Sequence, residues 1–132
     1  MSDVGEGETI AVDTAIWLDG LLFGGSSEEL VKLGMTGRVR LVTSEILLGE
    51  LADVLQRKLG YSDAAVREVL RFIREVAEVH DDLLDAAPAA GVPRGAVLDI
   101  ARRAGATCVA TTDGSALAPL DIHDGIPIIP IG

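Results

Sequence analysis

Apolar residues follow two different periods along the chain, and the change between them predicts strands separated by helices. The runs 10–14 and 107–113 are short and apolar, and residues 38–43 alternate between apolar and polar, so all three are expected to be strands. After the first run, apolar residues recur at helical spacing from Ile16 to Leu22, until Gly24–Gly25 ends the pattern. The chain therefore begins with a strand, a helix and further helical sequence before its second strand.

Start and stop signals divide the rest of the chain. Ser44 and Ser62 are residues that commonly begin helices, and Gly105 is a residue that commonly ends one. The other expected elements are a short helix capped by Ser26 or Ser27 that runs through Leu33, a helix from Ser44 to about Lys58, a helix from Ser62 with the inward stripe Val66, Leu70, Ile73 and Ala77, a short strand near Val76 to His80, a loop at Pro88–Pro93, a helix over about Ala96 to Ala104, and a tail strand at Ile126–Ile131.

Strands that alternate with helices predict an α/β protein, a three-layer α/β/α sandwich with a central, mostly parallel sheet. With 132 residues the chain is long enough for one core and too short for two domains. We expect residues 1–8, which are rich in Gly and acid, to be a disordered lead-in and 9–132 to form a single domain. Because Pro127 and Pro130 have no N–H group, the tail strand is expected at an edge of the sheet.

Composition and charge narrow the classes of function. Apolar residues make up 48% of the chain, and a mean hydropathy of +0.37 favours apolar surface buried in an oligomer, for which we expect a homodimer. The net charge of −10 argues against binding nucleic acid by charge alone, yet it suits a nuclease that reaches phosphate through metal ions, or a basic protein partner. The sequence has no apolar stretch of the roughly 18 residues that a membrane span needs and no signal peptide, so we expect a cytoplasmic protein.

Two of the expected strands end in an aspartate, Asp13 and Asp113. The carboxyl ends of parallel strands are where ligands gather in open α/β sheets, so both carboxylates are candidate ligands for Mg²⁺ or Mn²⁺. The alternative is local, because an aspartate after a strand often caps the next helix or forms a turn.

Glu50 is a third candidate ligand. At 100° per residue it falls within the apolar arc of its helix, between Ile46 and Val54. A carboxylate directed toward a core is costly unless a cation accompanies it. A metal ion would meet this need, and so would a structural ion pair.

The chain resembles a PIN domain, the metal-dependent nuclease fold of many prokaryotic toxins. The resemblance covers nearly the whole chain, and its subgroup is the toxins of toxin–antitoxin pairs. The residues that carry it are Ala11-Val12-Asp13-Thr14, Leu21-Leu22-Phe23-Gly24-Gly25, Leu41-Val42-Thr43-Ser44, Glu50-Leu51-Ala52-Asp53-Val54-Leu55, Val97-Leu98, Ala104-Gly105-Ala106, Ala110-Thr111-Thr112-Asp113 and Gly125-Ile126.

The resemblance implies that Asp13, Glu50 and Asp113 bind one or two divalent ions that activate water against an RNA phosphodiester, with Thr14, Thr111 and Ser115 in possible supporting roles. The chain departs from the family pattern at three positions. Gly95 stands where the pattern has a fourth acid, Ala15 where it has Asn, and Ser115 where it often has another Asp. This implies a site with weak activity or none.

Asp99 is a possible replacement for the missing acid, since it lies one helical turn, roughly 6 Å, beyond Gly95. The alternative is an ion pair with Arg102 and Arg103 at i+3 and i+4.

The helix after Ser62 carries the arginine stripe Arg67, Arg71 and Arg74, which could follow a phosphate backbone. Interleaved glutamates favour a salt-bridged surface instead.

Three hypotheses follow. The first is a Mg²⁺-dependent endoribonuclease toxin with RNA as substrate and a basic antitoxin as partner, and the second is a catalytically silent PIN-like module that binds RNA or a protein. The third, a phosphate-handling α/β protein, is disfavoured because the sequence lacks a Gly-rich loop between a strand and a helix and a suitably placed Lys.

Overall fold

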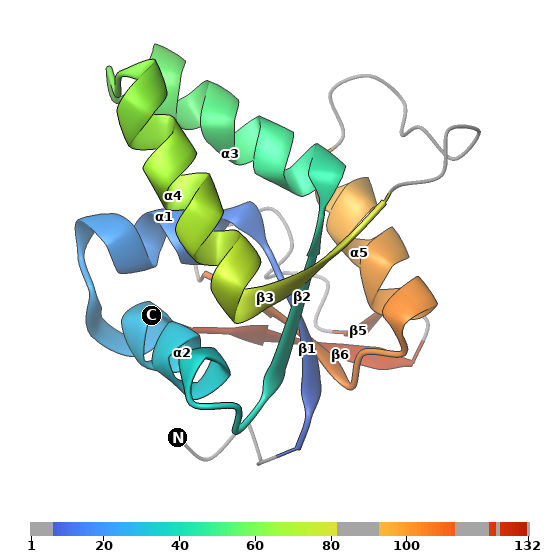
Figure 1. Ribbon diagram of the computed structural model, residues 1–132. Coiled ribbons are helices and arrows are strands. Elements are labelled where there is room, and N and C mark those ends of the chain that lie inside the picture. Colours follow the sequence, from blue (N-terminus) through green and yellow to red (C-terminus); the bar gives the residue numbers. More distant parts are fainter. Residues whose placement is uncertain (1–6, 82–92, 113–121, 124, 132) are drawn as a thin grey trace.

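The computed structural model describes residues 7–81, 93–112, 122–123 and 125–131 (Figure 1). Most of the expected lead-in, most of the Pro88–Pro93 loop, Asp113 and Ser115 lie outside these ranges. The elements are β1 (Thr9–Val12), α1 (Thr14–Leu22), α2 (Gly25–Met35), β2 (Arg40–Ser44), α3 (Glu45–Arg57), α4 (Asp63–Val76), β3 (Ala77–His80), α5 (Pro93–Ala104), β4 (Cys108–Thr111), β5 (Ile122–His123) and β6 (Ile126–Pro130).

The described strands form one sheet in the order β3-β2-β1-β4-β6-β5, in which β5 alone is antiparallel to its neighbour. Helices α1, α2 and α4 lie on one side of the sheet and α5 on the other, while α3 crosses above the end of β2 (Figure 1). This arrangement confirms the three-layer α/β/α sandwich with a mostly parallel sheet. None of the helices in the described ranges is both long and apolar enough to cross a bilayer.

Alternation along β1 divides the core between the two faces. Ile10 and Val12 pack in a cluster with residues of α1 to α4, whereas Ala11 packs with Val97 and Ile100 of α5. Because successive side chains of a strand point to opposite faces, this division also fixes which way the residues just beyond the strand point. It is used below to orient Asp13.

The expected helix starts are confirmed for α3 and α4. Ser44 accepts a hydrogen bond from the Leu47 N–H, and Ser62 accepts one from the Ala65 N–H. The expected cap of α2 is wrong, because that helix begins two residues before Ser27. Ser27 is instead fully buried and donates a 2.6 Å hydrogen bond to Asp19 of α1, so a contact between helices takes the hydroxyl that the sequence assigned to capping.

The tail strand also differs from expectation. β6 pairs with β4 on one side and with β5 on the other, so it is not the outermost strand. β5 is only two residues long and pairs only with Ile126 and Pro127. The short partner leaves the rest of β6 uncovered on that side, which is where Pro130 needs no donor.

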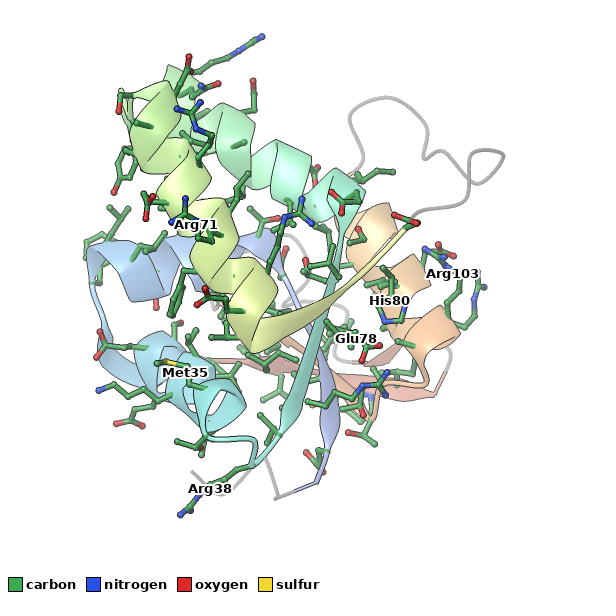
Figure 2. The ribbon with its side chains drawn as sticks, viewed as in Figure 1. Met35, Arg38, Arg71, Glu78, His80 and Arg103 are labelled. Atoms are coloured by element: carbon green, nitrogen blue, oxygen red, sulfur yellow. The ribbon has the colours of Figure 1, made fainter. Side chains whose placement is uncertain are left out.

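The opposite edge of the sheet is β3, and it carries charge. Glu78 pairs with Arg40 of β2 and with His80 two residues along the same strand, as their positions in Figure 2 allow the reader to follow. Charged side chains on an edge strand oppose its pairing with another sheet. This edge is therefore protected against strand-to-strand association.

Two glycines in helices give a matched test of this packing. A Cβ added at Gly34 would lie 2.5 Å from Cδ1 of Leu41, whereas one added at Gly49 would meet nothing within 4 Å. Since Leu41 is buried, Gly34→Ala is expected to lower the free energy of unfolding by about 1–3 kcal/mol through overpacking. Gly49→Ala is expected to raise it by about 0.5–1 kcal/mol. Urea denaturation measures both, and a gain at Gly34 would contradict the packing described.

Candidate metal and catalytic site

Asp13 follows β1 directly and lies beside the end of β4. Its N–H donates to the Ala110 carbonyl, which extends the ladder by one residue, and its Oδ2 accepts a 2.7 Å hydrogen bond from the Thr111 hydroxyl. Asp13 occupies the N-cap position of α1, but its side chain accepts no capping hydrogen bond. The carboxylate is therefore directed to the neighbouring strand and is not used to cap the helix.

Burial raises the pKa of the Asp13 carboxyl above its usual value of 3.8. The Thr111 hydroxyl opposes this effect, and so do the N–H groups of Thr14 and Ala15, which are too poorly aligned to count as capping bonds. The net rise means that the folded chain holds this proton more tightly than the unfolded chain does. A buried carboxylate that is costly to ionise is one that a bound cation would stabilise.

This shift predicts how stability depends on pH. Because the folded-state pKa of Asp13 exceeds the unfolded-state value, ionisation lowers stability as pH rises through the folded-state pKa, and this cost is absent below about pH 3.8. Asp13→Asn is therefore expected to raise the free energy of unfolding at pH 7, with a gain that shrinks toward pH 3. Urea denaturation at both pH values measures it, with Asp53→Asn on the exposed side of α3 as the control. Destabilisation of Asp13→Asn at pH 7 would contradict this reading.

Glu50 points toward the same side of the sheet as Asp13. On α3, Ile46 and Leu47 pack against the α5-side cluster, and at 100° per residue Glu50 lies between them around the helix. Its Oε1 atom is buried. On β1, Asp13 is two residues beyond Ala11, which packs in that same cluster. Both carboxylates therefore lie on the α5 side, near the carboxyl ends of the strands.

The start of α5 reaches this region as well. α5 precedes β4, packs on β1, β2 and α3, and connects to β4 through a turn at Gly105. A helix that leads into a strand in this way runs opposite to it, so its first turn lies at the carboxyl edge of the sheet. Gly95 is the third residue of α5. The position that lacks the family's fourth acid is therefore beside Asp13 and Glu50.

We call this region the acidic corner, defined by Asp13, Glu50, Thr111 and the first turn of α5. Thr14 adds a buried hydroxyl that has no hydrogen-bond partner among the described residues. Ala15, next along α1, adds no polar group. Two carboxylates and two hydroxyls are hard oxygen donors of the kind that suit Mg²⁺ or Mn²⁺.

The third expected ligand, Asp113, lies outside the described ranges, as does Ser115. Within those ranges no group of three or more Asp, Glu, His or Cys side chains is placed to hold a metal ion. Thr111, the last residue of β4, is two residues before Asp113, and its position at the acidic corner is the described part of the chain nearest to that ligand.

Asp99 forms the expected ion pairs. Its two carboxylate oxygens accept hydrogen bonds of 2.9 Å from Arg102 and from Arg103. Arg103 also donates to the Asp81 carbonyl, which ties α5 to the residue that follows β3. These bonds engage both oxygens of Asp99 in holding α5 in place.

The arginine stripe on α4 is salt-bridged in its described pairs. Arg71 pairs with Glu68 at 3.2 Å, and Arg74 pairs with Glu45 of α3 at 2.8 Å. The Arg74 pair holds the pKa of Glu45 below its usual value. These contacts support the interpretation as a surface of ion pairs that also joins α4 to α3.

The sequence analysis missed an apolar groove on the other face of the sheet, between α1, α2 and α4. It was missed because Leu21 and Leu22 were taken only as part of a helical pattern. The signal that could have found it is the unbroken apolar run Leu21-Leu22-Phe23, all of whose residues are exposed.

A model of the PIN domain family matches residues 9–115. The fold is shared with the VapC20 toxin of Mycobacterium tuberculosis, described as cleaving the sarcin–ricin loop, at 18% identity and a TM-score of 0.63 over 89% of this chain and 99% of that chain. It is also shared with VapBC2 from Rickettsia felis, solved with a DNA fragment from their promoter, at 12% identity and a TM-score of 0.67 over 94% and 99% of the two chains.

A third structure with this fold is the PIN domain endonuclease Utp24, at 18% identity and a TM-score of 0.59 over 94% of this chain and 85% of that one. No curated protein matches the chain in sequence. At these identities the structures establish the fold alone, whereas the family model spans most of the sequence. The chain therefore belongs to the PIN domain family.

Proposed function

We propose that this chain is a Mg²⁺- or Mn²⁺-dependent endoribonuclease of the toxin kind, whose acidic site is one ligand short and which therefore cleaves RNA slowly. The observation that carries the proposal is the acidic corner, where Asp13 and Glu50 lie on the same side of the sheet at its carboxyl edge. Membership of the PIN family supports it. So does the shared fold with a toxin that cleaves the sarcin–ricin loop and with the endonuclease Utp24.

In this proposal Asp13, Glu50 and Asp113 hold the ion. When bound, the ion would neutralise the scissile phosphate and supply an activated water. Thr111 fixes the orientation of the Asp13 carboxylate through its hydrogen bond. Thr14 offers a buried hydroxyl to a phosphate oxygen, with Ser115 as a further support. The ion is needed for substrate binding too, because a chain of net charge −10 would otherwise repel RNA.

The second candidate is a catalytically silent PIN module that binds RNA or a protein. The observation that favours it is the composition of the same corner, where Gly95 in the first turn of α5 and Ala15 in the first turn of α1 bring no polar side chain. Three carboxylates can hold one ion with water completing its shell, but a two-metal arrangement needs more ligands. The two candidates therefore differ in rate and share one site.

The toxin proposal extends to partners and location. We infer a cytoplasmic protein held by a basic antitoxin, which would complement the net charge of −10. We also infer a homodimer, which sedimentation analysis would reveal as twice the 13.8 kDa mass of one chain.

The test is cleavage of a structured RNA by the purified chain in Mg²⁺, in Mn²⁺ and in EDTA, with Asp13→Asn alongside. Metal-dependent cleavage that Asp13→Asn abolishes would support the endoribonuclease. Binding of RNA without cleavage in any metal would favour the silent module. Cleavage that survives in EDTA would contradict both.

A further inference from the structure

Helices α1, α2 and α4 enclose an apolar groove on the face of the sheet opposite the acidic corner. Its volume is about 330 Å³, and its lining comprises Trp17, Gly20, Leu21, Glu28, Val31, Lys32, Met35, Val69, Phe72 and Ile73. Met35 on α2 marks one wall of the groove, and Arg71 marks the outer side of α4 (Figure 2). We refer to it as the α1–α2–α4 groove.

Three large apolar side chains of this groove are open to solvent. Leu21, Met35 and Phe72 are 43%, 56% and 36% exposed. Single exposed apolar residues are ordinary on protein surfaces, but several that line one hollow are typical of an interaction site.

We propose that the α1–α2–α4 groove binds an amphipathic helix of a partner protein, with basic residues beside its apolar face. That the partner is the antitoxin rests on the proposed function, whereas the groove itself does not. A helix is inferred because all three walls are helices, whose backbone groups are bonded internally, so the groove offers no strand edge. An extended segment would leave its own N–H and C=O groups without partners there, whereas a helix satisfies them itself.

The charges around the groove favour a basic partner. Glu28 and Glu29 on α2 and Glu68 and Glu75 on α4 surround it, because on α4 the two glutamates flank Phe72. The two cations in this region, Lys32 and Arg71, are already paired with Glu28 and Glu68 at 3.3 and 3.2 Å. The remaining charge is therefore negative. A second copy of this chain, with its own net charge of −10, is a poorer match.

Trp17 adds a polar requirement to this apolar groove. The residue is 3% exposed, and its indole Nε1–H has no hydrogen-bond acceptor among the described residues. Buried N–H groups nearly always have an acceptor. We infer that the bound helix supplies one, through a side chain such as Gln, Asn or Ser placed among its apolar residues. Trp17 would then select partners and set their register in the groove.

The test uses three synthetic 18-residue helical peptides that lack Trp. The first has an apolar face that includes one Gln and is flanked by Lys and Arg, the second carries Glu in place of those bases, and the third is a scrambled version of the first. Because Trp17 is the only tryptophan of the chain, its fluorescence and its single indole N–H signal in a ¹⁵N-resolved NMR spectrum report directly on the groove.

The expected result is that the basic amphipathic peptide binds at least tenfold more tightly than either control peptide and shifts the indole N–H signal downfield. Leu21→Glu is expected to weaken this binding at least tenfold. Leu59→Glu, at a position that is 40% exposed and outside the groove, is expected to leave it within twofold. Trp17→Phe should weaken it three- to tenfold.

Equal binding of all three peptides, or of none, would overturn the proposal, as would equal effects of Leu21→Glu and Leu59→Glu. If Leu21→Glu instead converts a dimer to monomers in sedimentation analysis, the occupant is a second copy and the proposed partner is wrong. The RNA cleavage assay is separate, because Leu21 lies on the other face from Asp13. Peptide binding without RNA cleavage would refute the proposed function and leave the groove as inferred.

Discussion

Gly95→Asp is expected to raise the rate of metal-dependent RNA cleavage by about 10- to 100-fold, the range that support of a metal site commonly contributes. Gly95 is the third residue of α5, whose first turn lies at the acidic corner beside Asp13 and Glu50. A carboxylate there would add a ligand at the position where the family pattern has one. Single-turnover cleavage of the same RNA by both proteins, in Mg²⁺ and in Mn²⁺, measures the gain.

The control for this experiment is Gly95→Asn, which has the same shape without the charge. Both substitutions replace a helical glycine near the start of a helix, so both should keep or raise stability. A gain in rate with Asp and none with Asn would show that the charge is what the wild-type site lacks. Equal rates for Asp, Asn and wild type would contradict the account of a site that is one ligand short.

Glu50→Gln is expected to lower cleavage by at least about 100-fold, since it removes the charge of a proposed ligand and keeps its size. The loss should be measured both in the wild type and in the Gly95→Asp background, where the higher rate leaves more range for the measurement. Glu50 is the more informative acid to change, because it comes from a helix, and the geometry alone brings it to the side of the sheet where Asp13 lies.

Asp99→Asn is the matched control for Glu50→Gln. Asp99 is also a carboxylate on a helix near the corner, but both of its oxygens bind arginines of α5. Its substitution should change the cleavage rate by less than about threefold, the order expected when only a partly exposed ion pair is lost. If Asp99→Asn costs as much as Glu50→Gln, then Asp99 belongs to the site and the assignment of ligands must change.

Much of the fold could be predicted because local signals and tertiary structure agree. The N-caps Ser44 and Ser62 begin α3 and α4 as expected, and the short apolar runs became the central strands β1 and β4. β3, expected as a short strand after α4, also forms. In each of these cases the residues nearby in sequence decide the conformation.

The errors arose where a distant residue decides. Ser27 has the chemistry of an N-cap, but Asp19 of the preceding helix takes its hydroxyl, and α2 begins at Gly25. The tail strand has the prolines of an edge strand, yet the two-residue β5 pairs outside it. Neither contact leaves a periodic signal in the sequence, because one is a single side-chain bond and the other is too short to show a pattern.

The candidate site was predictable in its parts and not in its geometry. The positions of Asp13 and Glu50 follow from strand and helix periodicity. That the Asp13 carboxylate would turn to Thr111, 98 residues away, and leave the α1 N-terminus uncapped could not be read from local sequence. The groove was missed for a related reason, since exposure of Leu21 and Phe72 depends on how three helices pack.

The central claim is that the side chains of Asp13 and Glu50 bind one divalent ion together. Calorimetric titration of Mn²⁺ into the wild type, Asp13→Asn and Glu50→Gln tests it without reference to any RNA. The account predicts one ion per chain in the wild type and an affinity at least about tenfold weaker in each variant. Binding of Mn²⁺ with the same affinity by all three proteins would contradict it.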